Sequence, residues 1–127
     1  MHYLLESRAL LRTIQTTNIG LLTTARWAMP LLSKATDKPT LLVTGGMLWE
    51  TPIPQFFSLS IVKTSQRNLV RSLAMTYPDV HIAQVNVGGI VSPEDKIFNP
   101  TAVAEKFWAV YSEEKDQWTS ELNIVAA

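Results

Sequence analysis

The chain has 127 residues, of which 46% are hydrophobic and 17% are charged, and this predicts one globular domain over residues 1–127. The 11 basic and 11 acidic residues balance, which excludes the strongly basic surface that nucleic acid or an anionic membrane would require. The absence of cysteine excludes disulfides, thiolate nucleophiles and cysteine-based zinc sites.

Residues 4–34 are predicted to form a helix, because apolar side chains recur at helical spacing along the whole stretch. The polar run from Thr16 to Asn18, followed by Gly20, weakens the middle, so two shorter helices are the alternative. Residues 40–44 come next and are almost continuously apolar, which is typical of a strand buried in a parallel sheet.

A second major helix is predicted over residues 54–77. Pro54 is tolerated in its first turn, and Pro78 ends it. Residues 79–86 then form the next strand, since they are again mostly apolar and are bounded by turn residues.

The last part of the chain carries two helix-start signals. Ser92-Pro93 and Asn99-Pro100 each place a capping residue before a proline, and the second begins a helix over 100–114. Residues 118–125 alternate apolar and polar side chains, which favours an edge strand with one wet face.

A glycine pair follows each of the first two predicted strands, as Gly45-Gly46 and as Gly88-Gly89. The order strand, helix, strand with glycine turns at the carboxyl ends predicts a parallel α/β unit, in which ligands bind at those ends. The expected fold class is therefore α/β, with about three parallel strands at 40–44, 79–86 and 118–125.

Several phrases of the sequence resemble one family. Residues 28–32 are similar to the end of the helix before its catalytic-serine strand, residues 63–74 to the helix that begins at its active-site lysine, and residues 85–91 to its Pro-Gly segment along the nicotinamide. These three segments and the order of the predicted helices and strands resemble the C-terminal half of the short-chain dehydrogenase/reductase family. The resemblance implies a truncated Rossmann-like half-domain.

The catalytic set of that family is largely replaced here. Its tyrosine falls at Leu59, its serine near Gly45 or Gly46, and its asparagine at Thr17, with Asn18 one residue off. Of the family's catalytic residues, only the lysine has its counterpart here, at Lys63. No strand is followed by a G-x-G-x-x-G turn that would hold a pyrophosphate, so we expect no dinucleotide cofactor.

The loop after the first strand, residues 47–57, is rich in Met, Trp and Phe and carries one carboxylate. In the resembling family this loop lines the substrate pocket, and an apolar pocket with few polar groups suits a small hydrophobic ligand. The alternative is that these side chains belong to the core or to an interface. The predicted substrate-binding residues are Met47, Leu48, Trp49, Phe56, Leu59, Gly88 and Ile90.

Lys63 and Glu50 are the predicted catalytic residues, since burial can lower the pKa of a lysine and let it act. The alternative for Lys63 is a salt bridge on a helix. Trp27 and Trp108 are interpreted as packing residues. No cluster of His, Asp and Glu has metal-ligand spacing, so we expect no metal.

The leading hypothesis is a reductase-derived, cofactor-independent protein that binds a small apolar metabolite, with a non-redox cyclisation or isomerisation if it is an enzyme. Two alternatives stay open. One is a non-catalytic interaction subunit that completes its sheet with a partner chain, and the other is a residual NAD(P)-dependent oxidoreductase.

We also expect a homodimer through helices 4–34 and 54–77, which form the dimer bundle in the resembling family. Strand 40–44 would be an open apolar edge and is a further candidate for this contact. The first residues lack the apolar core of a signal peptide, and no apolar run approaches the ~20 residues of a membrane span. A cytoplasmic protein with no membrane partner is therefore expected.

Overall fold

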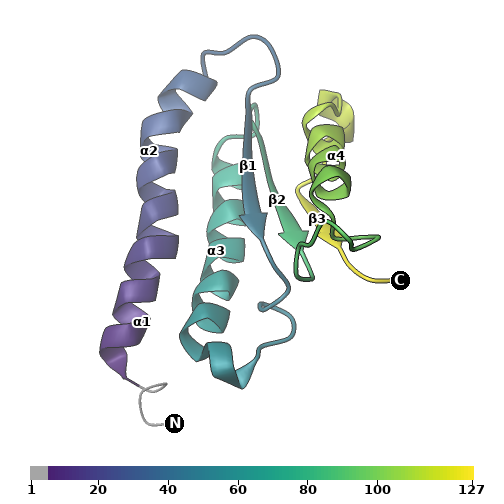
Figure 1. The fold of residues 1–127 in the computed structure, drawn as a ribbon. Helices are drawn as coiled ribbons and strands as arrows, with labels where there is room; N and C mark the ends of the chain where they lie inside the picture. Colours follow the sequence, from purple (N-terminus) through teal and green to yellow (C-terminus); the bar gives the residue numbers. More distant parts are fainter. Residues whose placement is uncertain (1–5) are drawn as a thin grey trace.

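The computed structural model describes residues 6–127. A long helical rod begins the chain and is followed by alternating strands and helices (Figure 1). The elements in order are α1 (Ser7–Thr13), η2 (Ile14–Ile19), α2 (Gly20–Leu32), β1 (Thr40–Gly45), η3 (Pro54–Phe56), α3 (Phe57–Thr76), β2 (His81–Val87), α4 (Pro100–Tyr111), η4 (Lys115–Gln117) and β3 (Glu121–Ile124).

The three strands form one sheet in the order β1-β2-β3, and both pairings are parallel. Thr40 of β1 lies opposite His81 of β2, and Gln84 of β2 lies opposite Glu121 of β3. The carboxyl ends of all three strands therefore meet at the same edge of the sheet. This confirms the predicted α/β fold class, a truncated Rossmann-like half-domain.

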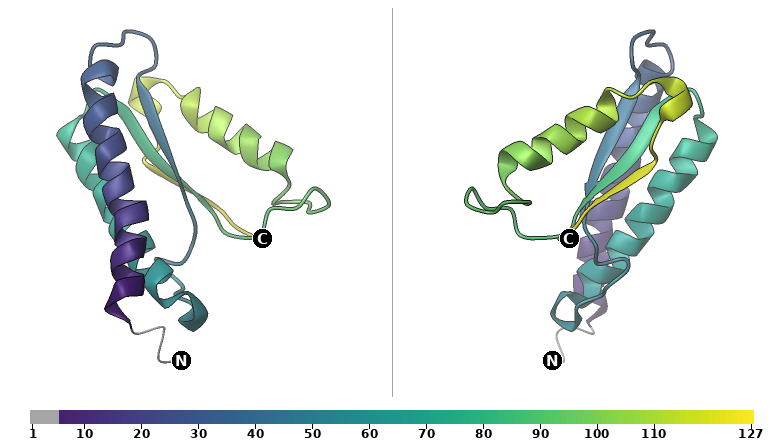
Figure 2. Two further views of the ribbon diagram at one scale, coloured as in Figure 1. Left: turned by 60° about the vertical axis from the view of Figure 1, so that its left-hand side comes forward. Right: turned by 90° about the vertical axis from the view of Figure 1, so that its right-hand side faces the viewer.

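Helices cover both faces of the sheet (Figure 2). The rod of α1, η2 and α2 lies with α3 on one face, where Met29, Val70 and Ile82 belong to one core cluster. On the other face α4 packs over the sheet, and Val85 and Val110 belong to a second cluster. Because successive residues of β2 point to opposite faces, the central strand contributes to both cores.

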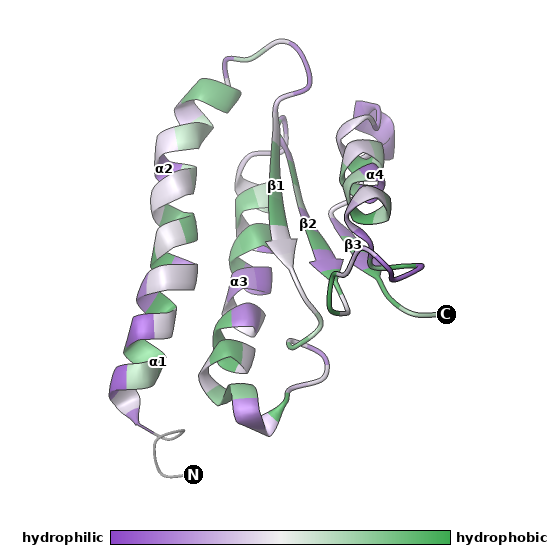
Figure 3. Cartoon of the chain, viewed as in Figure 1, coloured by the Kyte–Doolittle hydropathy of each residue, from purple (hydrophilic) through white to green (hydrophobic). Residues whose placement is uncertain are grey.

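Hydropathy follows this arrangement along the strands (Figure 3). β1 is hydrophobic along most of its length, whereas the end of β2 is hydrophilic. Gln84 and Asn86 are the polar residues there, and both are buried, with 1% and 0% of their surfaces exposed. The carboxyl half of β2 is therefore a buried strand with a polar row on one face.

The predicted helices and strands are present with small differences at their ends. The weak middle of helix 4–34 is η2, a stretch of π-helix within a continuous rod, and residues 4–5 lie outside the described part. Strand 118–125 shortens to β3, and Trp118, which lies before it, stacks its ring on His81 with 4.8 Å between the centroids.

Two expectations were wrong. Ser92-Pro93 begins no helix; instead one carboxylate oxygen of Asp95 accepts hydrogen bonds of 2.8 Å from the amides of Ile97 and Phe98, which closes a turn. Trp27 and Trp108 are not packing residues, since 70% and 68% of their surfaces are exposed.

No helix within residues 6–127 has the length and apolar character to cross a membrane.

Candidate functional site

A cavity of about 620 Å³ lies at the carboxyl ends of the strands, between the segment 46–53 that leaves β1, the start of α3 and the glycine turn after β2. We call it the strand-end cavity. Most of its lining side chains are apolar. The lining residues are Gly46, Met47, Leu48, Glu50, Thr51, Ile53, Phe56, Leu59, Val87, Gly88, Gly89 and Val125.

The structure brings most of the predicted site residues together here. Met47, Leu48, Glu50, Phe56, Leu59 and Gly88 all line the cavity. Trp49 and Ile90 do not; the ring of Trp49 lies against the guanidinium of Arg67, and 89% of the Ile90 surface is exposed. Lys63 is also outside the lining, one helical turn beyond Leu59 on the same face of α3.

The segment 46–53 forms one wall of the cavity. A turn closes it, since the amides of Glu50 and Thr51 both donate to the carbonyl of Met47 at 3.1 and 2.9 Å. Its far end is held by α3, where the Ser60 hydroxyl accepts a hydrogen bond of 3.4 Å from the amide of Ile53. The turn thus fixes the shape of the segment, and Ser60 holds its far end.

The middle of this wall contacts Arg67. The guanidinium of Arg67 lies 3.8 Å from the ring centroid of Trp49 and pairs with both carboxylate oxygens of Glu121 at 2.6 and 3.0 Å. The pKa of Arg67 is raised, first by its hydrogen bond to Glu121 and further by the charges of Glu121 and Glu50. Arg67 therefore links α3 and β3 to the cavity wall.

Lys63 points into a different environment. Its ammonium donates a hydrogen bond of 3.1 Å to the side-chain oxygen of Gln66. Burial lowers the pKa of Lys63, because a charged ammonium is less stable away from water. Lys63 thus lies at the border between the cavity and a buried polar network.

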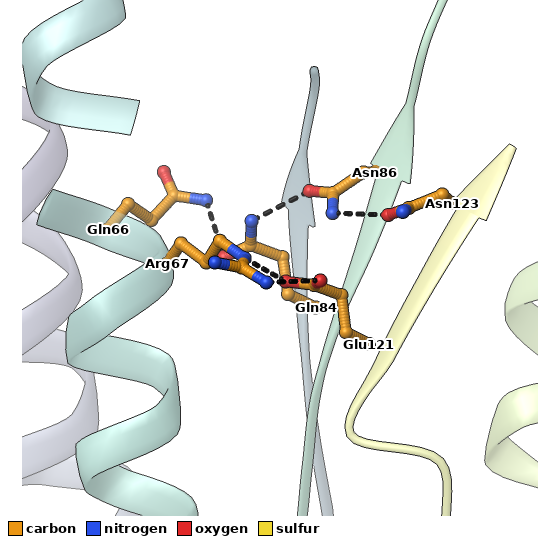
Figure 4. A network of polar contacts seen from close by, with 6 residues as sticks. All are labelled: Gln66, Arg67, Gln84, Asn86, Glu121 and Asn123. Carbon is orange, nitrogen blue, oxygen red and sulfur yellow. Dashed lines mark hydrogen bonds and ion pairs between the residues drawn. The ribbon is translucent and has the colours of Figure 1, made fainter. Parts of the chain in front are cut away.

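That network crosses the sheet under α3 (Figure 4). Gln66 donates to Gln84 at 3.3 Å, Gln84 donates to Asn86 at 2.7 Å, and Asn86 donates to Asn123 at 2.8 Å. Gln66 also donates to the carbonyl of Thr44 in β1 at 3.0 Å. Amide side chains therefore tie α3 to all three strands near their carboxyl ends.

Asn18 reaches the same region from η2. Its side-chain amide donates a hydrogen bond of 3.0 Å to the carbonyl of Val62, next to Lys63. In the sequence, Asn18 lies one residue from the position of the family's asparagine, and the polar run in the middle of an apolar helix was a further signal. A π-helical stretch often marks a functional position, and here it presents Asn18 to α3.

Neither glycine pair of the described residues has the geometry of the pyrophosphate cradle of a dinucleotide site. Gly45-Gly46 is separated from η3 by residues 47–53, and Gly88-Gly89 from α4 by residues 90–99, so neither glycine pair opens directly into a helix N-terminus. Residues 6–127 also contain no group of three or more His, Cys, Asp and Glu side chains that could hold a metal ion.

Comparison with known proteins gives a likeness in structure only. No family model matches the sequence, and no curated protein was found to be similar to it. The crystal structure of a short-chain dehydrogenase from Rhodopseudomonas palustris is similar, with a TM-score of 0.75 and 19% identity. The match covers 96% of this chain and 54% of that chain. The chain therefore has the fold of about half of a short-chain dehydrogenase.

Proposed function

We propose that the chain binds a small, mainly apolar metabolite in the strand-end cavity without a dinucleotide cofactor. The observation that carries this proposal is the cavity itself. Its volume of about 620 Å³ is in the range of small-molecule sites, and apolar side chains line most of it. Its place at the carboxyl ends of parallel strands is where α/β proteins bind ligands.

The polar groups suited to chemistry at this site are few. The Glu50 carboxylate lines the cavity, and the Lys63 ammonium lies one turn beyond Leu59. Leu59 has no hydroxyl with which to exchange a proton. If the protein is an enzyme, we propose a non-redox cyclisation or isomerisation, since holding a flexible apolar substrate in one conformation can itself lower such a barrier.

The experiment is thermal unfolding of the full chain with a panel of neutral bicyclic ketones and alcohols, and separately with NADH and NADPH. A ligand at 100 times its dissociation constant should raise the free energy of unfolding by ~2.7 kcal/mol, a shift of several degrees. Gly46→Phe should abolish the shift. A Cβ at Gly46 would meet only the carbonyl of Val87, at 3.5 Å, so the added ring can enter the cavity.

Ala104→Phe is the matched control, because it adds the same ring at an exposed position of α4. It should leave the ligand-induced shift unchanged. A shift that persists in Gly46→Phe would place the ligand elsewhere. A shift with NADH or NADPH, and none with the neutral panel, would instead favour the residual oxidoreductase.

A second candidate function, an interaction subunit, is favoured by the open edge of β1. Within residues 6–127, β1 pairs only with β2. Large apolar side chains are also exposed on the helices, among them Leu11, Trp27 and Leu31 on the rod and Met75 on α3. We propose a second copy of the chain as the partner. Sedimentation over a wide concentration range tests this, and a monomer at every concentration would exclude it.

A further inference from the structure

We propose that Arg67 is a positioning residue for the strand-end cavity: held by Glu121, it keeps Trp49 and the wall 46–53 in place. The inference concerns the wall itself. Its consequence for a ligand rests on the proposed function.

The contacts of Arg67 suit this role. Two hydrogen bonds to Glu121 fix the plane of the guanidinium, because the flat fork of an arginine matches a carboxylate. The side chains of Arg67 and Glu121 are only 30% and 22% exposed, so solvent screens the pair incompletely. The fixed plane lies 3.8 Å from the centroid of the Trp49 ring, a distance at which a cation attracts the face of an indole.

The contact with Arg67 matters for Trp49 because of the indole N–H. Its indole Nε1 is buried and has no hydrogen-bond partner among the residues that the structure describes. A buried donor without an acceptor disfavours the folded arrangement. The indole is thus held through its face rather than through its N–H, and the contact with Arg67 offsets part of that cost.

The position of Trp49 makes this contact important for the cavity. Its neighbours Leu48 and Glu50 both line the cavity, as does Met47, whose carbonyl closes the turn. The other anchors lie at the ends of the segment, at β1 and at Ser60. Release of Trp49 would therefore free the middle of the wall while both of its ends stay attached.

The test compares hydrogen exchange of the Glu50 and Thr51 amides in the wild type with that in Arg67→Met, Arg67→Lys and Glu121→Gln. Arg67→Met keeps the length of the side chain but removes its charge, and exchange should accelerate by about tenfold. Arg67→Lys should lie between Arg67→Met and the wild type, because an ammonium keeps the charge and loses the planar fork. Glu121→Gln keeps the shape of the partner and should also accelerate exchange.

Arg71→Met is the matched control, since Arg71 lies one turn further along α3 and is exposed. It should leave exchange of Glu50 and Thr51 unchanged. The amides of β2 report global stability, so the acceleration at Glu50 and Thr51 should exceed the acceleration in β2 in each variant of the Arg67–Glu121 pair. Unchanged rates at Glu50 and Thr51 in both Arg67→Met and Glu121→Gln would overturn the proposal, as would equal acceleration in the wall and in β2.

The second readout is the affinity for a neutral bicyclic ketone that shifts the wild type. It should weaken in Arg67→Met by a factor similar to the change in exchange. Faster exchange with unchanged affinity would show that the wall does not shape the site, and would overturn the positioning role. If the wild type binds no compound of the panel, the proposed function fails, and the exchange rates still decide whether Arg67 holds the wall.

Discussion

The side-chain amide of Asn18 donates a hydrogen bond of 3.0 Å to the main-chain carbonyl of Val62, the residue before Lys63. Asn18 and Val62 are 44 residues apart in the chain. The bond joins the π-helical stretch of the rod to α3 at the level of the lysine. It is a direct polar link between the first helix of the chain and the edge of the candidate site.

Replacement of Asn18 by Leu should lower the free energy of unfolding by about 1 kcal/mol, because the Val62 carbonyl loses a partly buried donor. Chemical denaturation measures this difference. Gln15→Leu is the control, since Gln15 is an exposed residue of the same π-helical stretch and should change stability by less than about 0.5 kcal/mol. Equal effects of the two substitutions would show that the bond contributes nothing.

The two glycines at the end of β1 should respond differently to alanine. A Cβ at Gly45 would lie 2.3 Å from the side-chain oxygen of Asn86 and 2.5 Å from the side-chain nitrogen of Gln84, and both amides are buried and hydrogen-bonded. Gly45→Ala should therefore cost about 1–3 kcal/mol of stability. Gly46→Ala meets no close neighbour and should be near neutral in the same unfolding measurement. A reversed order would contradict the packing described here.

The stability of the chain should depend on the charge of Lys63 at alkaline pH. Burial lowers the pKa of Lys63 below the ordinary lysine value of 10.5. Between the lowered pKa and 10.5 the unfolded chain binds more protons than the folded chain, so the free energy of unfolding rises with pH across this window. The charged Lys63 thus destabilises the folded chain. This effect is fully present below the lowered pKa and disappears as the pH approaches the ordinary value.

Amine acylation of Lys63, followed by mass spectrometry over a pH series, checks this directly. The midpoint should lie at lower pH in the folded chain than in the chain unfolded by urea. In denaturation experiments, the stability difference between the wild type and Lys63→Met should shift in favour of the wild type as the pH rises through the same window. Coincident acylation midpoints would contradict the effect of burial.

Gly20 should be replaceable with a gain in stability. It lies inside the continuous rod with helical backbone angles, φ −58° and ψ −46°, and the nearest heavy atom to an added Cβ is 3.9 Å away. Gly20→Ala should raise the free energy of unfolding by about 0.5–1 kcal/mol, because alanine loses less backbone freedom on folding. A lower melting temperature for this variant would show that the π-helical stretch needs a glycine.

The architecture could be predicted because its signals are local. The nearly continuous apolar run of 40–44 is typical of a buried strand, and Pro54 and Pro78 bracket α3. The cavity lining could be predicted in large part for a similar reason, since Met47, Leu48 and Glu50 follow one strand directly. The order of these elements was one of the grounds for the resemblance to the short-chain dehydrogenase/reductase family.

The rest depends on contacts between distant segments. Gln66, Gln84 and Asn123 meet only when the register of the strands and the rotation of α3 are known. Gln84 and Asn86 did carry a signal, because alternate polar residues in an apolar strand share one face. Trp27 and Trp108 were misjudged because hydrophobicity does not reveal which helix face is covered. The pairing of Arg67 with Trp49 had no signal in the sequence.

The bond between Asn86 and Asn123 has a consequence for how β3 can pair. Alternation of apolar and polar residues excludes a slip of one residue, which would turn every side chain to the wrong face. A slip of two residues preserves that alternation, so hydrophobic burial would not disfavour it. It would, however, place Glu121 or Val125 opposite Asn86 in place of Asn123, and so remove the amide that accepts the hydrogen bond of the buried Asn86 side chain. The amide pair thus distinguishes between alignments that hydrophobic burial alone treats as equivalent.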